Sequence, residues 1–195
     1  MNIAVLMGYS PENKALKELT APGWESYCKS HRYNFCEYPR KLDGYLLSDL
    51  WMLQFLVGRF DQVLMIDADV LQTNTDTKLP DACAGAVLMS RECDGRCPIN
   101  AGVSLWNQGV FAERLIEWLI GEYARWAYGR EPDIYWQSWL AGNPEWMDGV
   151  TVLPTEILCS SDQWEDRPWR KGDFLCHFLG GTVESKIERI KEMFP

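Results

Sequence analysis

The sequence predicts an α/β protein in which helices flank a mostly parallel central sheet. Apolar runs of strand length alternate along the chain with longer stretches whose apolar residues recur at helical spacing. Hydrophobic residues make up 47% of the 195 residues and charged residues 24%, which is ordinary composition for a globular protein. No repeat, low-complexity tract or linker divides the sequence, so residues 1–195 are predicted to form a single domain.

Seven segments have the length and composition of strands. Residues 2–8 form a continuous apolar run that stops at a Tyr-Ser-Pro loop, and residues 33–38 combine aromatic residues before Pro39. Residues 62–67 and 84–90 are again apolar, as expected of strands that are buried on both faces. The full expected set is 2–8, 33–38, 62–67, 84–90, 99–106, 150–153 and 174–177.

The segments between these strands carry helix signals. Apolar residues three and four positions apart predict helices over 45–59 and 110–127, and a shorter helix is expected over 133–141. The segment after the first strand is helical in pattern up to about His31. We expect it to break at Pro22-Gly23, because proline removes a backbone donor and clashes with the preceding turn.

The charge and cysteine usage of the chain exclude several classes of protein. A net charge of −9 disfavours non-specific binding to nucleic acid or to anionic membranes. No apolar run reaches the ~18 residues of a membrane span, and residues 1–10 lack the basic segment and cleavage site of a signal peptide. The seven irregularly spaced cysteines fit a reducing compartment, so a cytoplasmic location is predicted.

Two carboxylates lie at the end of the apolar run at 63–66: Asp67 directly follows the run, and Asp69 comes two residues later. Residues i and i+2 of a strand point to the same side, and open α/β sheets bind ligands at the carboxyl ends of their strands. Mg²⁺ and Mn²⁺ prefer carboxylate oxygens and keep positions open for substrate phosphates. The pair therefore predicts a divalent-metal site, which would also let an acidic protein bind a phosphate ester. The alternative is a pair of carboxylates that cap a loop or the next helix.

His177 is the predicted third ligand of this site. It is one of two histidines and lies in an apolar segment, 174–179, that is followed by two glycines. Imidazole is a usual ligand for Mn²⁺ but rare for Mg²⁺, although a buried histidine can also be a satisfied core residue. A final helix is expected after Thr182, whose hydroxyl can cap it.

Three motifs carry a resemblance to a known family. They are Ile66-Asp-Ala-Asp69, Ile99-Asn-Ala-Gly-Val103 and Gly172-Asp-Phe-Leu-Cys-His-Phe-Leu-Gly180. In this order and spacing the chain resembles the GT-A (Rossmann-like) glycosyltransferases, especially the retaining α-galactosyl, α-mannosyl and α-xylosyl transferases. It is more loosely similar to glycogenin and the bacterial lipopolysaccharide galactosyltransferases. The matches span about residues 60–180.

The resemblance implies which residues bind the donor. Asp67, with the rest of the Asp-x-Asp (DXD) motif and His177, would bind Mn²⁺ (or Mg²⁺), which holds the diphosphate of a UDP-sugar. The resemblance also implies that further residues line the donor site: Gly8, Tyr9, Asn100, Gly102, Gly180 and Lys186. Lys186 lies further from His177 than the glycogenin-like pattern has it. These families also place a basic residue on the helix before the Asp-x-Asp strand; that helix has none here, and Arg40 and Lys41 lie upstream.

The residues that would act on the sugar match the family only in part. The family often carries an Asp-Gln pair before the late strands, and here Gln137 aligns whereas Trp136 stands where the Asp would be. Gln137 would then face the anomeric carbon, with Asp133 one helical turn away. A polar helix surface is the alternative. Retention allows a side-chain nucleophile or front-face attack by the acceptor hydroxyl.

The ten tryptophans offer candidates for an acceptor site. Indole rings stack on the C–H faces of sugars, and Trp164 and Trp169 lie in a charged loop rather than a core pattern. The alternative is that each is a large core anchor.

The predicted function is a metal-dependent glycosyltransferase that moves a hexose or pentose from a UDP-sugar to a saccharide, protein or small-molecule acceptor, with retention. A non-catalytic relative that binds nucleotide-sugars or carbohydrates is the first alternative, because Trp136 replaces the Asp. A nucleotidyltransferase is the second, and the absence of a Gly-rich basic loop after the first strand disfavours it.

Overall fold

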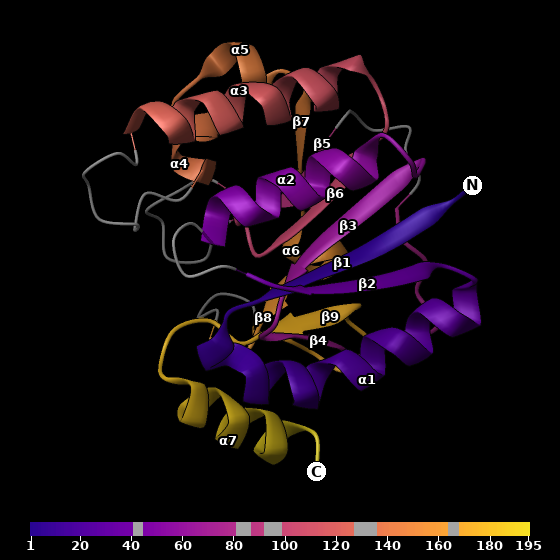
Figure 1. Ribbon diagram of the computed structural model, residues 1–195. Coiled ribbons are helices and arrows are strands. Elements are labelled where there is room, and N and C mark those ends of the chain that lie inside the picture. Colours follow the sequence, from indigo (N-terminus) through magenta and orange to yellow (C-terminus); the bar gives the residue numbers. More distant parts are fainter. Residues whose placement is uncertain (41–44, 81–86, 92–98, 127–135, 164–167) are drawn as a thin grey trace.

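The computed structural model of the protein describes residues 1–40, 45–80, 87–91, 99–126, 136–163 and 168–195. A six-stranded sheet with the order β2-β1-β3-β6-β5-β7 forms its centre (Figure 1). These strands are β1 (Ile3–Tyr9), β2 (Asn34–Pro39), β3 (Gln62–Asp67), β5 (Val87–Ser90), β6 (Val103–Asn107) and β7 (Val150–Leu153). Among them β6 alone runs antiparallel to its neighbours, so the predicted mostly parallel sheet is confirmed.

Alternating side chains of β1 and β3 fill the two faces of this sheet. Val5 and Leu64 belong to the apolar cluster beneath α1 (Lys14–His31), whereas Leu6 and Val63 belong to the cluster on the opposite face. All four are fully buried, as the continuous apolar runs of the sequence predict. Figure 1 shows α2 (Tyr45–Val57) and α3 (Val110–Trp126) over that opposite face.

A second, three-stranded sheet lies on the α1 side and was not predicted from the sequence. Its order is β4-β9-β8, formed by β4 (Val70–Gln72), β9 (Leu175–His177) and β8 (Ser160–Ser161). β4 and β9 pair antiparallel with Val70 opposite His177. This pairing brings the end of the Asp-x-Asp segment against the segment that carries the late histidine.

The remaining elements are short except for the last helix. They are η1 (Pro11–Asn13), α4 (Trp136–Ala141), α5 (Pro144–Met147), α6 (Thr155–Leu158) and α7 (Val183–Met193). The hydroxyl of Thr182 accepts from the backbone N–H of Ser185 at 3.3 Å, so the predicted N-cap of α7 is confirmed. In the part of the chain that the structure describes, no helix combines the length and apolar character needed to cross a membrane.

The predicted break at Pro22-Gly23 is wrong, because α1 continues through Pro22. Proline costs a helix interior about 3 kcal/mol, but the turns on both sides of it are tied to the rest of the protein. Thr20 and Trp24 are fully buried and donate hydrogen bonds to backbone carbonyls of the segment after β3. Tertiary burial therefore outweighs the local preference of this sequence.

The predicted strand 99–106 is too long at its beginning, since β6 starts at Val103. The side chain of Asn100 accepts a hydrogen bond from the N–H of Gly102 at 2.9 Å. Such a local turn competes with an extended strand. Strand β5 is seen from Val87 onward, and residues 84–86 lie outside the described part of the chain.

Candidate metal centre

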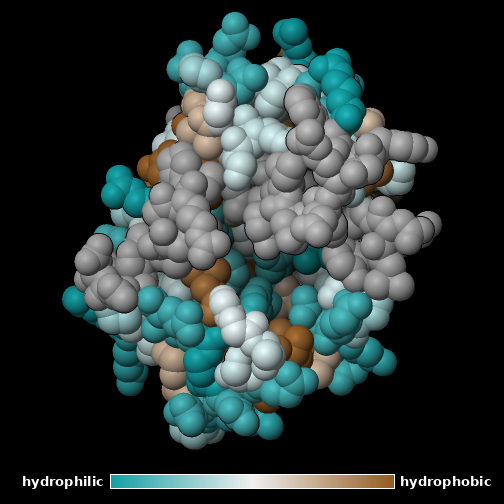
Figure 2. Space-filling view, turned by 90° about the vertical axis from the view of Figure 1, so that its left-hand side faces the viewer, coloured by the Kyte–Doolittle hydropathy of each residue, from teal (hydrophilic) through white to brown (hydrophobic). Residues whose placement is uncertain are grey.

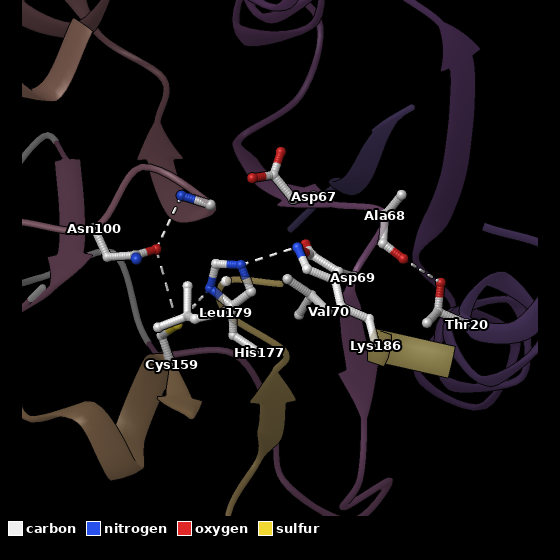
Figure 3. Close-up of polar contacts among 12 residues, drawn as sticks. Thr20, Asp67, Ala68, Asp69, Val70, Asn100, Cys159, His177, Leu179 and Lys186 are labelled. Carbon is white, nitrogen blue, oxygen red and sulfur yellow. Dashed lines mark hydrogen bonds and ion pairs between the residues drawn. The ribbon is translucent and has the colours of Figure 1, made fainter. Parts of the chain in front are cut away.

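Asp67, Asp69 and His177 come together at the carboxyl end of β3 (Figure 3). One ligand atom from each of the three side chains lies within 4.8 Å of the others. The imidazole Nε2 of His177 is 3.3 Å from a carboxylate oxygen of Asp69. The two carboxylates are partly exposed, whereas His177 is 4% exposed. The three predicted metal ligands therefore form one cluster.

Gly102 makes the close approach of these side chains possible. A Cβ atom at this position would stand 2.3 Å from Cε1 of His177 and 3.0 Å from an oxygen of Asp67. Its carbonyl accepts from the N–H of Asp67 at 2.9 Å, so the residue also holds the end of β3 in place. Gly102 and Asn100, both predicted to lie near the donor, thus adjoin the cluster.

The second ring nitrogen of His177 faces away from the carboxylates. Its Nδ1 lies 3.6 Å from the sulfur of Cys159, which follows α6 and is buried. Figure 3 shows Cys159 and Asn100 on this inner side of the imidazole. Burial opposes a charge on His177, but the adjacent Asp69 carboxylate raises the pKa of the imidazole well above its usual value.

Lys186, on α7, is the cation that contacts Asp69. Its Nζ is 2.5 Å from the carboxylate, on the oxygen that His177 does not approach. Burial by itself would raise the pKa of Asp69, but the neighbouring His177 and Lys186 together lower it below its ordinary value. Lys186, predicted to line the donor site, therefore lies against the cluster, and Asp69 is held as a carboxylate.

Arg40, which directly follows β2, is the cation that contacts Asp67. Its Nη2 is 2.5 Å from Asp67, and its Nε donates to Asp49 of α2 at 2.8 Å. The hydroxyl of Tyr38 donates to the same oxygen of Asp49. Burial, followed by the nearby charge of Asp67, raises the pKa of Asp49 well above its usual value. Arg40 thus brings a basic side chain to Asp67 from the end of β2, whereas α2 carries none.

Arg40, Asp49 and Tyr38 fill the space that a side chain at Gly8 would need. A Cβ at Gly8 would stand 2.7 Å from Nε of Arg40 and 2.9 Å from the Asp49 carboxylate. Gly8 was predicted to line the donor site, and the structure places it against Arg40, Asp49 and Tyr38. Tyr9 is partly buried, and the ammonium of Lys17 lies 5.4 Å from the centre of its ring.

The remaining predicted site residues are Gly180, Trp169, Asp133, Gln137 and Trp164. Gly180 adopts a φ of +58°, which glycine readily allows, in the turn that joins β9 to α7. Trp169 is partly buried, packs edge-on against Phe194 and donates to Thr73, contacts that fit the core-anchor alternative. Three predicted residues fall outside the described part of the chain, in whole or, for Gln137, in the side chain: Asp133, Gln137 and Trp164.

Sequence reasoning did not single out Asp49 or Cys159. Asp49 lies within an apolar helical pattern, and a carboxylate on the buried side of such a helix is a signal that was not used. Cys159 offered no comparable signal, because only the folded chain brings it to His177.

The cluster can hold a divalent cation. Two carboxylate oxygens and one imidazole nitrogen suit Mn²⁺, and two basic side chains beside them suit a phosphate-bearing ligand. Figure 2 shows the face toward which β1 and β3 run, and it is hollowed near its centre.

The fold is shared with solved glycosyltransferase structures. A glycosyltransferase involved in the glycosylation of the major capsid of PBCV-1 has a TM-score of 0.80 at 18% identity, covering 98% of this chain and 100% of that one. The galactosyltransferase LgtC, solved with donor and acceptor sugar analogs, gives 0.59 at 14% identity, with 98% and 96% covered. Glycosyltransferase GlyE of Streptococcus pneumoniae TIGR4 gives 0.60 at 16% identity, and the match covers 96% of this chain and 60% of GlyE.

At these identities the comparisons establish the fold, and they confirm the predicted GT-A-like architecture. No protein-family model and no curated protein sequence matches the chain.

Proposed function

We propose that this protein is a metal-dependent glycosyltransferase that transfers a hexose or pentose from a UDP-sugar to an acceptor hydroxyl with retention of configuration. The observation that carries the proposal is the Asp67–Asp69–His177 cluster at the carboxyl edge of a GT-A-like sheet. Ligands of open α/β sheets bind at this edge, and a cation held there would neutralise the departing diphosphate.

The ligand set favours Mn²⁺ over Mg²⁺. Asp67 and Asp69 would each supply an oxygen and His177 would supply Nε2, the ring nitrogen that faces the carboxylates. Bound there, the metal would act as a Lewis acid on the diphosphate oxygens. Gly102 leaves the room that the three side chains need.

Arg40 and Lys186 are proposed to bind the diphosphate. Each now contacts one of the two carboxylates, at 2.5 Å in both cases, and Arg40 also contacts Asp49. A divalent cation and a doubly charged diphosphate carry equal and opposite charges, so the two can enter together without a net change of charge. A cation entering alone would meet two positive side chains, so the metal and the nucleotide should bind cooperatively.

Residues that act on the sugar remain those predicted from the sequence. Gln137 is proposed to face the anomeric carbon, with Asp133 beside it, and Trp164 to contact the acceptor. A nucleophilic Asp133 would require double displacement, whereas Gln137 alone fits front-face attack by the acceptor hydroxyl.

The non-catalytic alternative predicts a different experimental outcome. Trp136 stands where the family places an acidic residue, so a protein that binds UDP-sugars without transfer retains the metal site but lacks turnover. Release of UDP from UDP-glucose, UDP-galactose and UDP-xylose with Mn²⁺ distinguishes the two, because many transferases hydrolyse the donor slowly and a pure binder does not.

Binding is tested by thermal unfolding with UDP or GDP, each with and without Mn²⁺. Ligands that bind only the folded state raise the midpoint according to their affinity. We expect UDP to raise it with Mn²⁺ and much less with EDTA. Asp69→Asn and His177→Gln should abolish the Mn²⁺-dependent rise, while His31→Gln, which alters the other histidine, should keep it. The absence of any Mn²⁺-dependent nucleotide effect in the wild type would refute the proposal.

A further inference from the structure

Two side chains of α1 hold the backbone that carries the metal-binding carboxylates. The hydroxyl of Thr20 is 2.8 Å from the carbonyl oxygen of Ala68 and 3.1 Å from that of Leu16, and its single proton is donated to the nearer oxygen, that of Ala68. The indole N–H of Trp24 donates to the carbonyl of Val70 at 2.8 Å. The contact between Thr20 and Ala68 is drawn in Figure 3. Both donors are fully buried, so water cannot replace either of them.

The carbonyl of Asp69, which lies between those of Ala68 and Val70, accepts a hydrogen bond from a different segment. The N–H of Phe178, just after β9, donates to the carbonyl of Asp69 at 3.0 Å. Three consecutive carbonyls are therefore fixed from two sides, by α1 and by the strand that ends in His177. The orientation of the peptide groups flanking Asp69 sets the direction of its Cα–Cβ bond, and so the position of its carboxylate.

This arrangement requires the unbroken helix that the sequence did not predict. Thr20 and Trp24 lie four residues apart and therefore on one face of α1. A break at Pro22, between them, would separate the two donors. The continuity of α1 through Pro22 thus has a role at the site as well as in the core.

We propose that Thr20 and Trp24 are positioning residues of the metal centre: they set the geometry of Asp67 and Asp69 through hydrogen bonds to the backbone carbonyls of Ala68 and Val70, the neighbours of Asp69 on either side. The inference rests on the proposed metal-binding function. Without the Thr20 hydroxyl the buried carbonyl of Ala68 loses its donor, and the peptide group turns to find another. The carboxylates then leave the positions at which they meet His177.

The test compares Mn²⁺ affinity with stability in variants of the 195-residue chain. Thr20→Val removes the hydroxyl at nearly constant volume, Thr20→Ser keeps it, and Tyr27→Phe is the matched control. Tyr27 is also fully buried on α1, and its hydroxyl donates to the carbonyl of Thr77 at 3.0 Å, beyond β4. Free Mn²⁺ is counted by electron paramagnetic resonance, and the unfolding midpoint is measured on the same samples.

We expect Thr20→Val to weaken Mn²⁺ binding by about tenfold, the lower end of the effect of outer-shell residues in metal sites. Thr20→Ser should stay close to the wild type, and Tyr27→Phe should lower the midpoint without changing Mn²⁺ affinity. Trp24→Phe, which removes the indole N–H, should act like Thr20→Val. If Thr20→Val does not fold, the smaller Thr20→Ala serves as the variant without a hydroxyl.

Two results would overturn the inference. If the folded Thr20→Val or Thr20→Ala protein bound Mn²⁺ as tightly as the wild type, Thr20 would contribute to the fold and not to the metal centre. An equal loss in Thr20→Ser would show that the hydroxyl is not the cause. In both cases the wild type still binds Mn²⁺ and the proposed function stands. A wild type that binds no Mn²⁺ would instead remove the proposed function together with the inference.

Discussion

Gly102 lies so close to His177 that a Cβ atom on it would stand 2.3 Å from Cε1 of the imidazole. The same atom would be 3.0 Å from an oxygen of Asp67. Gly102→Ala must therefore displace one of the two side chains. We expect Mn²⁺ affinity, measured by electron paramagnetic resonance, to fall by about tenfold or more, as when other groups that orient ligands are altered.

Gly121→Ala is the control for this substitution. Gly121 lies in α3, and no atom within 4 Å would meet its Cβ. Alanine in a helix interior should raise the free energy of unfolding by about 0.5–1 kcal/mol, and Mn²⁺ affinity should not change. Normal Mn²⁺ binding by Gly102→Ala would contradict the role assigned to the cluster.

Lys186→Met is predicted to change metal and nucleotide binding in opposite directions. The ammonium neutralises Asp69, so its removal should tighten the binding of Mn²⁺ alone. UDP in the presence of Mn²⁺ should bind about tenfold more weakly, because one charge-assisted hydrogen bond is lost. Calorimetric titration with Mn²⁺ and then with UDP measures both. Lys191→Met, on the exposed side of α7, is the control. Weaker binding of both Mn²⁺ and UDP by Lys186→Met would count against the prediction.

Arg40→Met is predicted to destabilise the protein through Asp49. The substitution leaves a buried carboxyl group without its cation, which should lower the free energy of unfolding by about 3 kcal/mol. Adding Asp49→Asn should recover much of this loss, as a double-mutant cycle in urea would measure. Lys17→Met, which breaks the more exposed pair with Glu37, should cost less than about 1 kcal/mol. Equal costs for the two single substitutions would show that burial of the Arg40 pair is unimportant.

Cys159→Ala should weaken the metal site without an unusual loss of stability. It removes the partner of the His177 Nδ1, and such partners typically contribute ten- to a hundred-fold, about tenfold here, to metal affinity. Cys28→Ala is the matched control: Cys28 is also buried, and burial raises the pKa of its thiol to about 12, so it is a neutral core group. Mn²⁺ titrations of both variants, with their unfolding midpoints, separate the two effects. Similar Mn²⁺ affinities in the two variants would argue that Cys159 only packs.

Local pattern was sufficient for much of the fold and for the identity of the metal-ligand candidates. The apolar run before Asp67 is strand β3, and Thr182 caps the last helix. These features depend on neighbours in the sequence, through side-chain periodicity and the capping of free N–H groups.

Features that depend on distant partners were missed. The course of α1 through Pro22 follows from the burial of Thr20 and Trp24, which the local sequence does not report. Asp49 pairs with Arg40 through the approach of α2 to the end of β2. One local feature was missed as well: the side chain of Asn100 accepts from the N–H of Gly102, two residues further on, so the strand begins only at Val103.

The sequence by itself determined the three candidate metal ligands: two carboxylates after a buried strand and a late histidine in an apolar segment. The tertiary structure decided how they meet. Lys186 reaches Asp69 across 117 residues of chain, and His177 arrives because β9 pairs with β4 in one register. A one-residue slip would turn that side chain to the other face of the sheet. Strand register and loop closure depend on the packing of the whole chain, and periodicity within a segment does not encode them.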